Sequence, residues 1–124
     1  MKQSCITLDN LVDFIISHIG YNDRNRIKEY IKYHIQYGTF DYATDDKDNI
    51  VGCVRFNVTD GNIFDVFDFS VDKKWRRKGV GRNLILRSLM RFPDAKYIRF
   101  QRVIRGDDRF KIIPIEKIIK RNIL

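Results

Sequence analysis

Apolar positions near the start of the chain recur every three or four residues, the spacing of an amphipathic helix. Residues 4–7 can form a short strand before it. The helix has Asp9 or Asn10 as its expected cap and Gly20 at its end. Its buried stripe is expected to consist of Leu11, Phe14, Ile15 and Ile19.

The same spacing returns after Asn22 and Asp23, either of which can cap a second helix that ends near Gly38. The apolar stripe of this helix consists of Ile27, Ile31, His34 and Ile35. We expect His34 to be a partly buried helix residue rather than a catalytic group.

From Thr39 onward the spacing becomes that of β-strands. Segments rich in β-branched and aromatic residues cover 39–43, 50–58 and 63–71, and polar turns at 45–48 and 59–62 separate them. The pattern predicts an antiparallel meander of three strands.

Residues 80–92 are apolar on several sides, which predicts a helix that packs against a sheet and stops at Pro93. Residues 96–103 form a further predicted strand, and Pro114 fits the first turn of a terminal helix. The predicted order is β-α-α-β-β-β-α-β-α, an α+β fold. The strands before and after the crossover helix should be parallel neighbours.

Composition agrees with one folded domain over residues 1–124, because 44% of the residues are hydrophobic and 32% are charged. We recognise no targeting or membrane-spanning segment and therefore expect a cytoplasmic protein without membrane contact. Cys5 and Cys53 form no CxxC pair and match no zinc-ligand spacing, so we expect reduced thiols and no metal site.

Charge is distributed unevenly along the chain. Residues 1–70 carry a formal charge of −4 and residues 71–124 carry +12, which gives the net charge of +8. A basic half of this kind attracts the phosphates of nucleic acid or of a polyanionic cofactor. A solvated basic face is the alternative.

The segment between the last strand of the meander and the buried helix carries the strongest functional signal. Gly79 and Gly81 let the main chain approach a ligand, and the helix start offers unpaired N–H groups, an arrangement that binds phosphate. The segment lacks a Walker A motif, and Leu84 stands where the dinucleotide fingerprint needs a third glycine. It matches R/Q-x-x-G-x-G/A from Arg76 to Gly81.

With this motif and with the order of the surrounding elements, the chain resembles the GNAT family of N-acetyltransferases over about residues 4–103. Val71, five residues before Arg76, matches the strand-end valine of the family. The resemblance implies a GNAT-like mixed sheet with a parallel, splayed strand pair, and acetyl-CoA as co-substrate. The compact ending after Arg105 departs from the family pattern and resembles small acetyltransferases of tailed phages.

The resemblance also implies roles for the turn. N–H groups from Arg77 or Lys78 to Arg82 would hold the pyrophosphate of coenzyme A, while main-chain groups near Phe69 and Val71 would pair with the pantetheine arm. The expected cofactor-binding set is Phe69, Val71, Arg76, Arg77, Lys78, Gly79, Val80, Gly81 and Arg82. A glutamate at Gly81 is expected to abolish cofactor binding and leave the fold intact.

Attack of an amine on a thioester needs a proton acceptor, and Asp65 and Asp68 on the third meander strand are the candidates. Strand alternation puts Asp65 on the face of Phe69 and Val71, and Asp68 on the other face, barring a bulge. Burial among aromatic residues would raise the pKa of such a carboxyl group, whereas a solvated or Arg-paired carboxylate is the alternative. The thiolate-protonating tyrosine of the family has no counterpart after Tyr97.

These features favour an N-acetyltransferase that transfers an acetyl group from acetyl-CoA to a primary amine of an unknown acceptor. The alternative is an inactive GNAT-like binding module that contacts nucleic acid or a host protein through Arg82, Arg87, Arg91, Arg99, Arg102 and Arg105. Pairing through the terminal segment, which is common among relatives, would give a homodimer.

Overall fold

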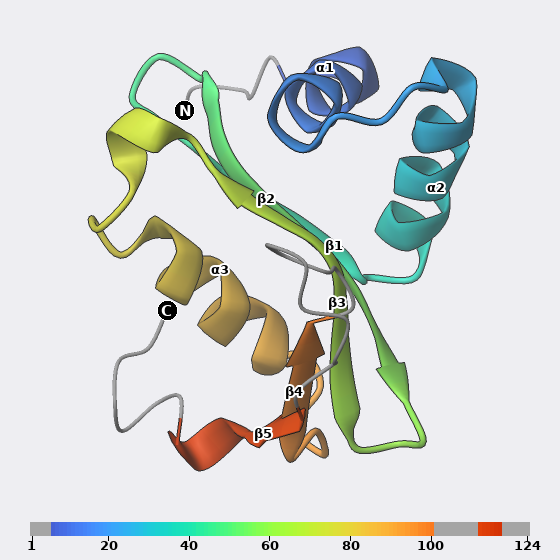
Figure 1. Ribbon diagram of the computed structural model, residues 1–124, viewed down its shortest axis with the longest axis vertical. Coiled ribbons are helices and arrows are strands. Elements are labelled where there is room, and N and C mark those ends of the chain that lie inside the picture. The colour runs from blue at the N-terminus through green and yellow to red at the C-terminus, as the bar shows by residue number, and fades with distance from the viewer. Residues whose placement is uncertain (1–5, 101–111, 118–124) are drawn as a thin grey trace.

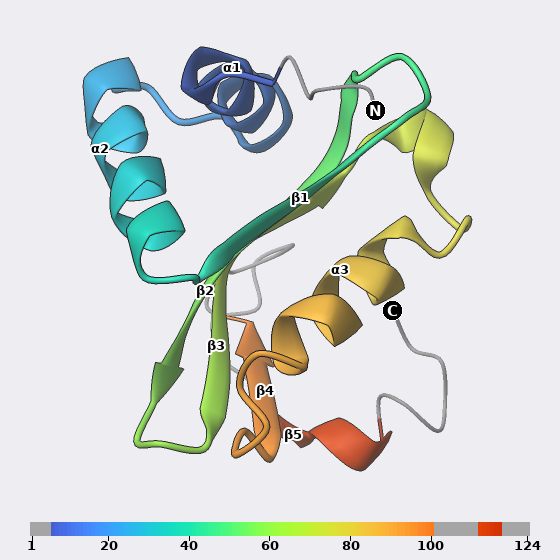
Figure 2. The ribbon, with the colours of Figure 1, turned by 180° about the vertical axis from the view of Figure 1, so that it is seen from behind.

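The computed structural model describes residues 6–100 and 112–117. Its elements follow the chain as α1 (Leu8–Ile19), α2 (Arg24–Gln36), β1 (Phe40–Thr44), β2 (Ile50–Thr59), β3 (Ile63–Val71), a 3-10 turn η1 (Lys73–Trp75), α3 (Val80–Leu89), β4 (Tyr97–Phe100) and β5 (Ile112–Pro114). One mixed sheet, in the order β1-β2-β3-β4-β5, separates α1 and α2 on one face from α3 on the other (Figures 1 and 2). This is the predicted α+β architecture.

Helix α1 begins earlier than predicted because Thr7 is its cap. The Thr7 hydroxyl accepts a hydrogen bond from the Asn10 amide at 3.1 Å, and the Asn10 side chain accepts one from the Thr7 amide at 3.0 Å. Ile6 and Thr7 are therefore not in a strand, and residues 4 and 5 of the predicted first strand lie outside the described residues. Gly20 ends the helix in the left-handed conformation, as predicted.

Helix α2 is capped by Asp23, one of the two predicted residues. Ile27, Ile31 and His34 are buried, but 49% of Ile35 is exposed, so its place in the buried stripe was wrong. Ile35 lies about 100° further round the helix than His34 and so points away from the sheet.

The meander is antiparallel, and β3 and β4 are parallel neighbours, as predicted. The end of the chain differs in part: Ile112–Pro114 form strand β5, antiparallel to β4, and residues 115–117 directly after it are helical, so the predicted terminal helix begins one residue later than expected. A proline tolerates the last position of an edge strand, where its missing N–H costs no ladder bond. The remainder of the predicted terminal helix, from residue 118, and residues 101–103 of the predicted strand lie outside the described residues.

Two apolar clusters hold the layers together. One joins α1 and α2 to the sheet through Leu11, Val12, Phe14, Ile15, Ile27, Ile31, Phe40 and Cys53. The other joins α3 to the opposite face through Val54, Phe56, Phe64, Val66, Leu84, Ile85 and Ile98. Burial of each large apolar side chain contributes about 1.5–3 kcal/mol.

Helix α3 is shorter and less widely buried than predicted. It ends at Leu89, and its buried face is the single stripe Leu84, Ile85 and Ser88, while 81% of Met90 is exposed. None of the helices in the described part of the chain is long and apolar enough to cross a membrane. Burial raises the pKa of the Cys53 thiol; Cys5 lies outside the described residues.

Candidate functional site

A pocket of about 310 Å³ opens where β3 ends and α3 begins. Its lining consists of Phe69, Val71, Trp75, Arg76, Arg77, Gly79, Val80 and Gly81. The structure thus brings together every residue of the expected cofactor-binding set except Lys78 and Arg82, and adds Trp75. Gly79, Val80 and Gly81 have small side chains or none, so a ligand in the pocket can approach the main chain at the start of α3.

The turn that forms this pocket is anchored at both ends. The Arg76 Nε donates to the Val71 carbonyl oxygen at 3.1 Å, which ties the turn back to β3. The Asp72 carboxylate accepts from the Lys74 amide at 3.0 Å and contacts the His18 Nε2 of α1 at 3.1 Å. The hydrogen bond with His18 lowers the pKa of Asp72. The turn therefore has a fixed position relative to both the sheet and α1.

Between these anchors two residues of the turn have a left-handed main chain. Arg77 has φ 63° and Gly79 has φ 84°, both in the left-handed region. The first hydrogen bond of α3 runs from the Asn83 amide to the Gly79 carbonyl oxygen at 3.0 Å. Within the described ranges, no protein group accepts a hydrogen bond from the amides of residues 77–82. These amides lie at the positive end of the helix dipole and remain available to an anion.

Gly81 allows α3 to approach the end of β3 closely. A Cβ at position 81 would lie 2.8 Å from Cζ of Phe69 and 3.3 Å from Cγ2 of Val71. Any side chain at this position would push the Phe69 ring aside. Gly81→Glu would therefore disturb this ring as well as the turn. The expectation that this variant keeps its fold stays a prediction, and other substitutions test the turn more cleanly.

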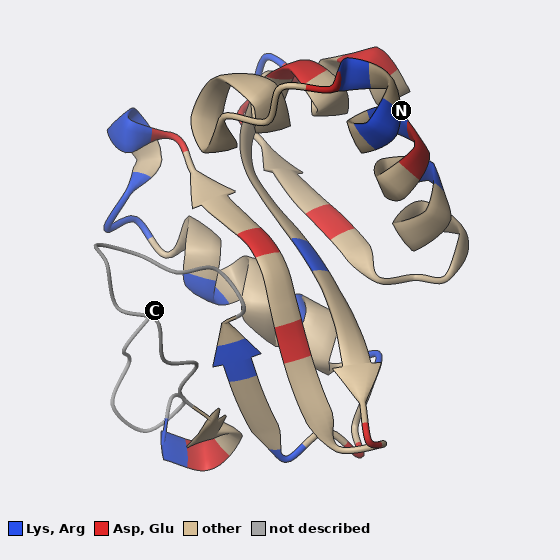
Figure 3. Cartoon of the chain, turned by 45° about the vertical axis from the view of Figure 1, so that its right-hand side comes forward, with Lys and Arg blue, Asp and Glu red and all other residues tan. Residues whose placement is uncertain are grey.

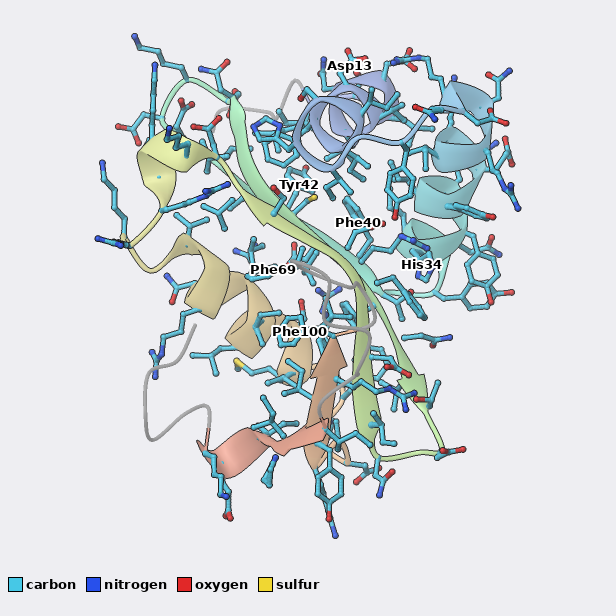
Figure 4. All side chains as sticks on the ribbon, viewed as in Figure 1. Asp13, His34, Phe40, Tyr42, Phe69 and Phe100 are labelled. Carbon is cyan, nitrogen blue, oxygen red and sulfur yellow. The ribbon has the colours of Figure 1, made fainter. Side chains whose placement is uncertain are left out.

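The β3 strand has an unpaired stretch next to the pocket. It pairs with β4 only from Ile63 to Val66, and among residues 6–100 and 112–117 nothing pairs with 67–71 on that side. The rings of Phe69 and Phe100 face each other where the strands diverge, with centroids 6.1 Å apart (Figure 4). This edge can accept an extended chain as an added strand would.

A bulge in β3 changes the faces of the two candidate aspartates. Arg55 pairs with Asp68 but the next residue, Phe56, pairs with Val66, so Phe67 is an extra residue in β3. Because of this insertion Asp65 and Asp68 both lie on the α1 and α2 side of the sheet, so the exception that the sequence analysis allowed for a bulge is the case found. Figure 3 shows the two acidic bands on β3 beside basic bands on β2 and β4.

Asp65 is only 1% exposed and is held by a guanidinium group. Its carboxylate accepts hydrogen bonds from Arg99 Nε at 2.7 Å, Arg99 Nη2 at 2.6 Å and the Thr59 hydroxyl at 2.7 Å. A bidentate arginine offsets the cost of burying the carboxylate. The alternative from the sequence, an Arg-paired aspartate, is thus the arrangement found.

Asp68 is 2% exposed, and it binds side chains from two other parts of the chain. These contacts were not predicted from the sequence. It accepts from Arg55 Nε at 2.5 Å and from the Tyr21 hydroxyl, which lies in the turn between α1 and α2. Burial and the hydrogen bond to Asp68 raise the pKa of Tyr21. The available signal for this site was Arg55, the one charged residue of β2, since a largely buried arginine requires a partner.

His34 closes the other side of this cluster and is buried, as predicted. Its Nε2 lies 3.2 Å from Arg55 Nη1 and its Nδ1 lies 2.7 Å from the Thr39 hydroxyl. Burial, together with the charge of Arg55, lowers the pKa of His34 to about 4. The side chain lies between α2 and the sheet (Figure 4).

The basic residues divide into three sets. Asp41 contacts Arg87 at 2.7 Å and Arg91 at 3.3 Å, and Arg99 binds Asp65, so three arginines of the suggested nucleic-acid surface have acidic partners within the chain. Two others, Arg102 and Arg105, lie outside the described residues. A third set of basic residues lies in the turn between β3 and α3 (Figure 3), and two of them line the pocket, Arg76 and Arg77. The cations of the turn are Lys73, Lys74, Arg76, Arg77 and Lys78.

Comparisons with known proteins agree with this geometry. A family model described as an acetyltransferase (GNAT) domain matches residues 37–107. A GNAT family acetyltransferase from Streptococcus pneumoniae aligns with TM-score 0.61 and 21% identity over 86% of this chain and 76% of its own. Ard1 from Thermoplasma volcanium aligns with TM-score 0.65 and 17% identity over 94% and 77%.

A GNAT family N-acetyltransferase from Escherichia coli, whose crystal structure contains CoA, aligns with TM-score 0.57 and 14% identity over 90% of this chain and 77% of its own. At these identities the likeness shows a shared fold. No curated protein matches the chain. The family match over more than half of the chain, together with the mixed sheet and its open β3 edge, shows that the chain belongs to the GNAT family of acetyltransferases.

Proposed function

We propose that the protein is an N-acetyltransferase that transfers an acetyl group from acetyl-CoA to a primary amine of an acceptor still to be identified. The pocket at the start of α3, with the unbonded amides of residues 77–82, is the observation that carries the proposal. The E. coli relative with CoA in its crystal structure supports the choice of cofactor.

In this proposal the pyrophosphate of coenzyme A binds the amides of residues 77–82, with Arg77 and Lys78 adding positive charge. The pantetheine arm lies along β3 from Phe69 to Val71, where the strand edge offers main-chain hydrogen bonds. Gly79, Val80 and Gly81 would line the phosphates, and Arg76 would hold the turn closed on Val71.

The chemistry is a nucleophilic acyl substitution. A neutral amine attacks the thioester carbonyl carbon, a C–N bond forms, the C–S bond breaks and coenzyme A leaves as a thiolate. An N–H group of the β3 edge near Val71 would polarise the carbonyl group. Between the two candidate bases, Asp68 lies in the unpaired stretch of β3 and Asp65 in the paired stretch. We therefore assign the proton-accepting role to Asp68, with water as the carrier, and a structural role to Asp65.

Incubation of the protein with acetyl-CoA and a panel of primary amines tests this function. We expect release of the coenzyme A thiol above the protein-free rate and a mass increase on the amine that corresponds to acetylation. Heat of binding and a thermal shift with acetyl-CoA should be seen even when no amine is turned over. Absence of both heat and thermal shift at millimolar acetyl-CoA would contradict the proposal.

A further inference from the structure

His18 lies in the last turn of α1, and its imidazole ring reaches the turn that precedes α3. Its Nε2 lies 3.1 Å from a carboxylate oxygen of Asp72, the residue directly after β3. Its Nδ1 lies 2.9 Å from the Phe14 carbonyl oxygen, one helical turn earlier, and 2.9 Å from Ser17 Oγ. Both ring nitrogens therefore face oxygen atoms of the protein.

Two of these oxygen atoms can only accept a hydrogen bond. A carbonyl oxygen has no proton, so His18 Nδ1 must donate to Phe14. The hydrogen bonds from His18 and from the Lys74 amide lower the pKa of Asp72, which keeps its carboxyl group ionised. Nε2 must therefore donate to Asp72 as well. A ring that donates from both nitrogens is an imidazolium.

A neutral ring cannot make the same contacts. With its proton on Nδ1, the Nε2 lone pair faces the Asp72 carboxylate. With its proton on Nε2, the Nδ1 lone pair faces the Phe14 carbonyl oxygen, and the Ser17 hydroxyl, which donates to that oxygen at 3.1 Å, must turn away to satisfy Nδ1. Two further features favour the charged ring. It lies at the C-terminal end of α1, and it stacks on the Phe14 ring with centroids 3.9 Å apart.

Charged groups from three elements lie near His18. Among the described residues only Asp72 forms an ion pair with it. The remaining groups are two basic and two acidic residues, whose charges largely offset one another at their greater distance. They are Lys74 of the turn, Lys47 and Asp48 of the hairpin between β1 and β2, which line a cleft together with Ser17, and Asp13 of α1.

Asp72 in turn holds the part of the chain that lines the cofactor pocket. Its side chain accepts from the Lys74 amide at 3.0 Å, and its carbonyl oxygen accepts from the Trp75 amide at 2.8 Å. Its own amide donates to the Val51 carbonyl oxygen of β2 at 2.7 Å. Trp75 and Arg76 line the pocket. A change in the position of Asp72 would therefore move one side of the pocket.

We propose that His18 is a positioning residue for coenzyme A: its imidazolium form holds Asp72 and with it the turn that lines the pocket, and loss of its proton releases the turn. This inference rests on the proposed acetyltransferase function and adds to it a control of cofactor affinity by pH. Histidine side chains change charge between about pH 5 and pH 8. Affinity for coenzyme A should therefore be highest at the acidic end of this range and fall as the pH rises.

The expected change is modest, because the side chains of His18 and Asp72 are 25% and 33% exposed. We expect the His18-dependent part of the affinity to fall roughly 2- to 5-fold between pH 6 and pH 8, the range of a partly exposed ion pair. A residue with a purely structural role would change affinity without changing its dependence on pH.

Titration calorimetry with coenzyme A at pH 6 and pH 8 measures this control. The phosphates of the ligand also titrate, so the ratio of the dissociation constant at pH 8 to that at pH 6 is compared between proteins. This ratio should be larger in wild-type protein than in His18→Gln, whose side-chain NH2 can still donate to Asp72 but does not titrate. His34→Gln makes the same change at the other histidine of the sequence and is the matched control, which should keep the wild-type ratio.

Asp72→Asn should reverse the dependence on pH. Its amide oxygen must stay on the Lys74 amide, which only donates, so its NH2 faces His18 Nε2. An NH2 donor requires a neutral ring with its proton on Nδ1, so the contact forms at pH 8 and breaks at pH 6. The ratio of dissociation constants should therefore be smaller in this variant than in His18→Gln.

Nitrogen-15 NMR of the imidazole rings reports the protonation of His18 directly. If the proton on His18 favours coenzyme A, the ligand must favour the proton to the same degree. Addition of coenzyme A at pH 7 should therefore raise the imidazolium fraction of His18 in wild-type protein and in His34→Gln.

The outcomes separate this inference from the function on which it rests. If coenzyme A binds with the same ratio in wild-type protein and His18→Gln, or without raising the imidazolium fraction of His18, the inference is wrong and the proposed function stands. Asp72→Asn replaces His18→Gln in the comparison with wild-type protein if the latter does not fold. If coenzyme A binds at neither pH, the proposed function is wrong and the inference falls with it.

Discussion

Arg77 combines a left-handed backbone at φ 63° with a side chain in the lining of the pocket. Arginine and glutamate are both L-residues with a Cβ, so each must adopt the same left-handed conformation at this position. The replacement therefore changes mainly the charge beside the expected pyrophosphate, from positive to negative. We expect Arg77→Glu to weaken acetyl-CoA binding about tenfold or more, equivalent to ~1.4 kcal/mol, measured by titration calorimetry.

Lys96→Glu is the control for this substitution, because it makes the same charge change on an exposed residue just before β4. It should bind acetyl-CoA like wild-type protein. Equal weakening in both variants would mean that overall charge, rather than contact at the turn, determines affinity.

His34 makes stability dependent on pH. Its pKa falls from the usual 6.5 to about 4 in the folded state, so the unfolded chain takes up a proton first as the solution becomes acidic. The free energy of unfolding should therefore be insensitive to this group above pH 6.5 and should fall between pH 6.5 and pH 4, by about 1–3 kcal/mol.

Urea denaturation across this range, with wild-type protein and His34→Gln, measures the effect. The variant should lose part of the pH dependence, although its stability at neutral pH will also be lower because Arg55 loses a partner. If the free energy of unfolding depends on pH equally in both proteins, the contacts of His34 with Arg55 and Thr39 do not hold it in its neutral form.

The uncovered stretch of β3 and the start of α3 should respond together to the cofactor, because both would contact it. Hydrogen–deuterium exchange should show amides of 67–71 and 77–82 becoming protected when acetyl-CoA is added. Amides in α2, on the other face of the sheet, provide the internal reference and should change little. Protection confined to the turn would mean that the pantetheine arm does not follow β3.

Sequence reasoning recovered the elements whose signals are local. The two helices, the meander and the parallel β3 and β4 follow from periodicity and turn residues, and the pocket lining follows from a motif within one short segment. The β5 strand was missed because its pairing with β4 is long-range and Pro114 has a local preference for a helix start.

The faces of Asp65 and Asp68 could not be predicted for a related reason. One bulged residue, Phe67, reverses the alternation of β3, and its presence is fixed by register with β2 rather than by any residue nearby in sequence. The contact between Tyr21 and Asp68 joins positions 47 residues apart, so periodicity carries no information about it.

The basic residues of the C-terminal half differ in whether they have acidic partners within the chain. Three of the arginines suggested as a nucleic-acid surface are paired with Asp41 or Asp65, whereas the cations of the turn flank the pocket. We therefore expect any complex with a single-stranded oligonucleotide at low salt to dissociate near 0.15 M salt, roughly the physiological ionic strength. Coenzyme A should displace it, because both ligands would use the same cations.

Gel shifts at increasing salt, with and without coenzyme A, distinguish the two functions. A complex that survives high salt and ignores coenzyme A would favour the binding module over the acetyltransferase. A dimer through the terminal segment stays a prediction, and sedimentation of the free protein would test it.

If main-chain amides at the start of α3 bind a diphosphate, the protein must distinguish acetyl-CoA from acetyl-pantetheine. The two compounds share the thioester and the pantetheine arm, and only acetyl-CoA carries the pyrophosphate and nucleotide. Titration calorimetry should give clear binding of acetyl-CoA and at least about 100-fold weaker binding of acetyl-pantetheine, a difference of ~2.8 kcal/mol. Equal affinity for both compounds, or no binding of acetyl-CoA, would contradict the account.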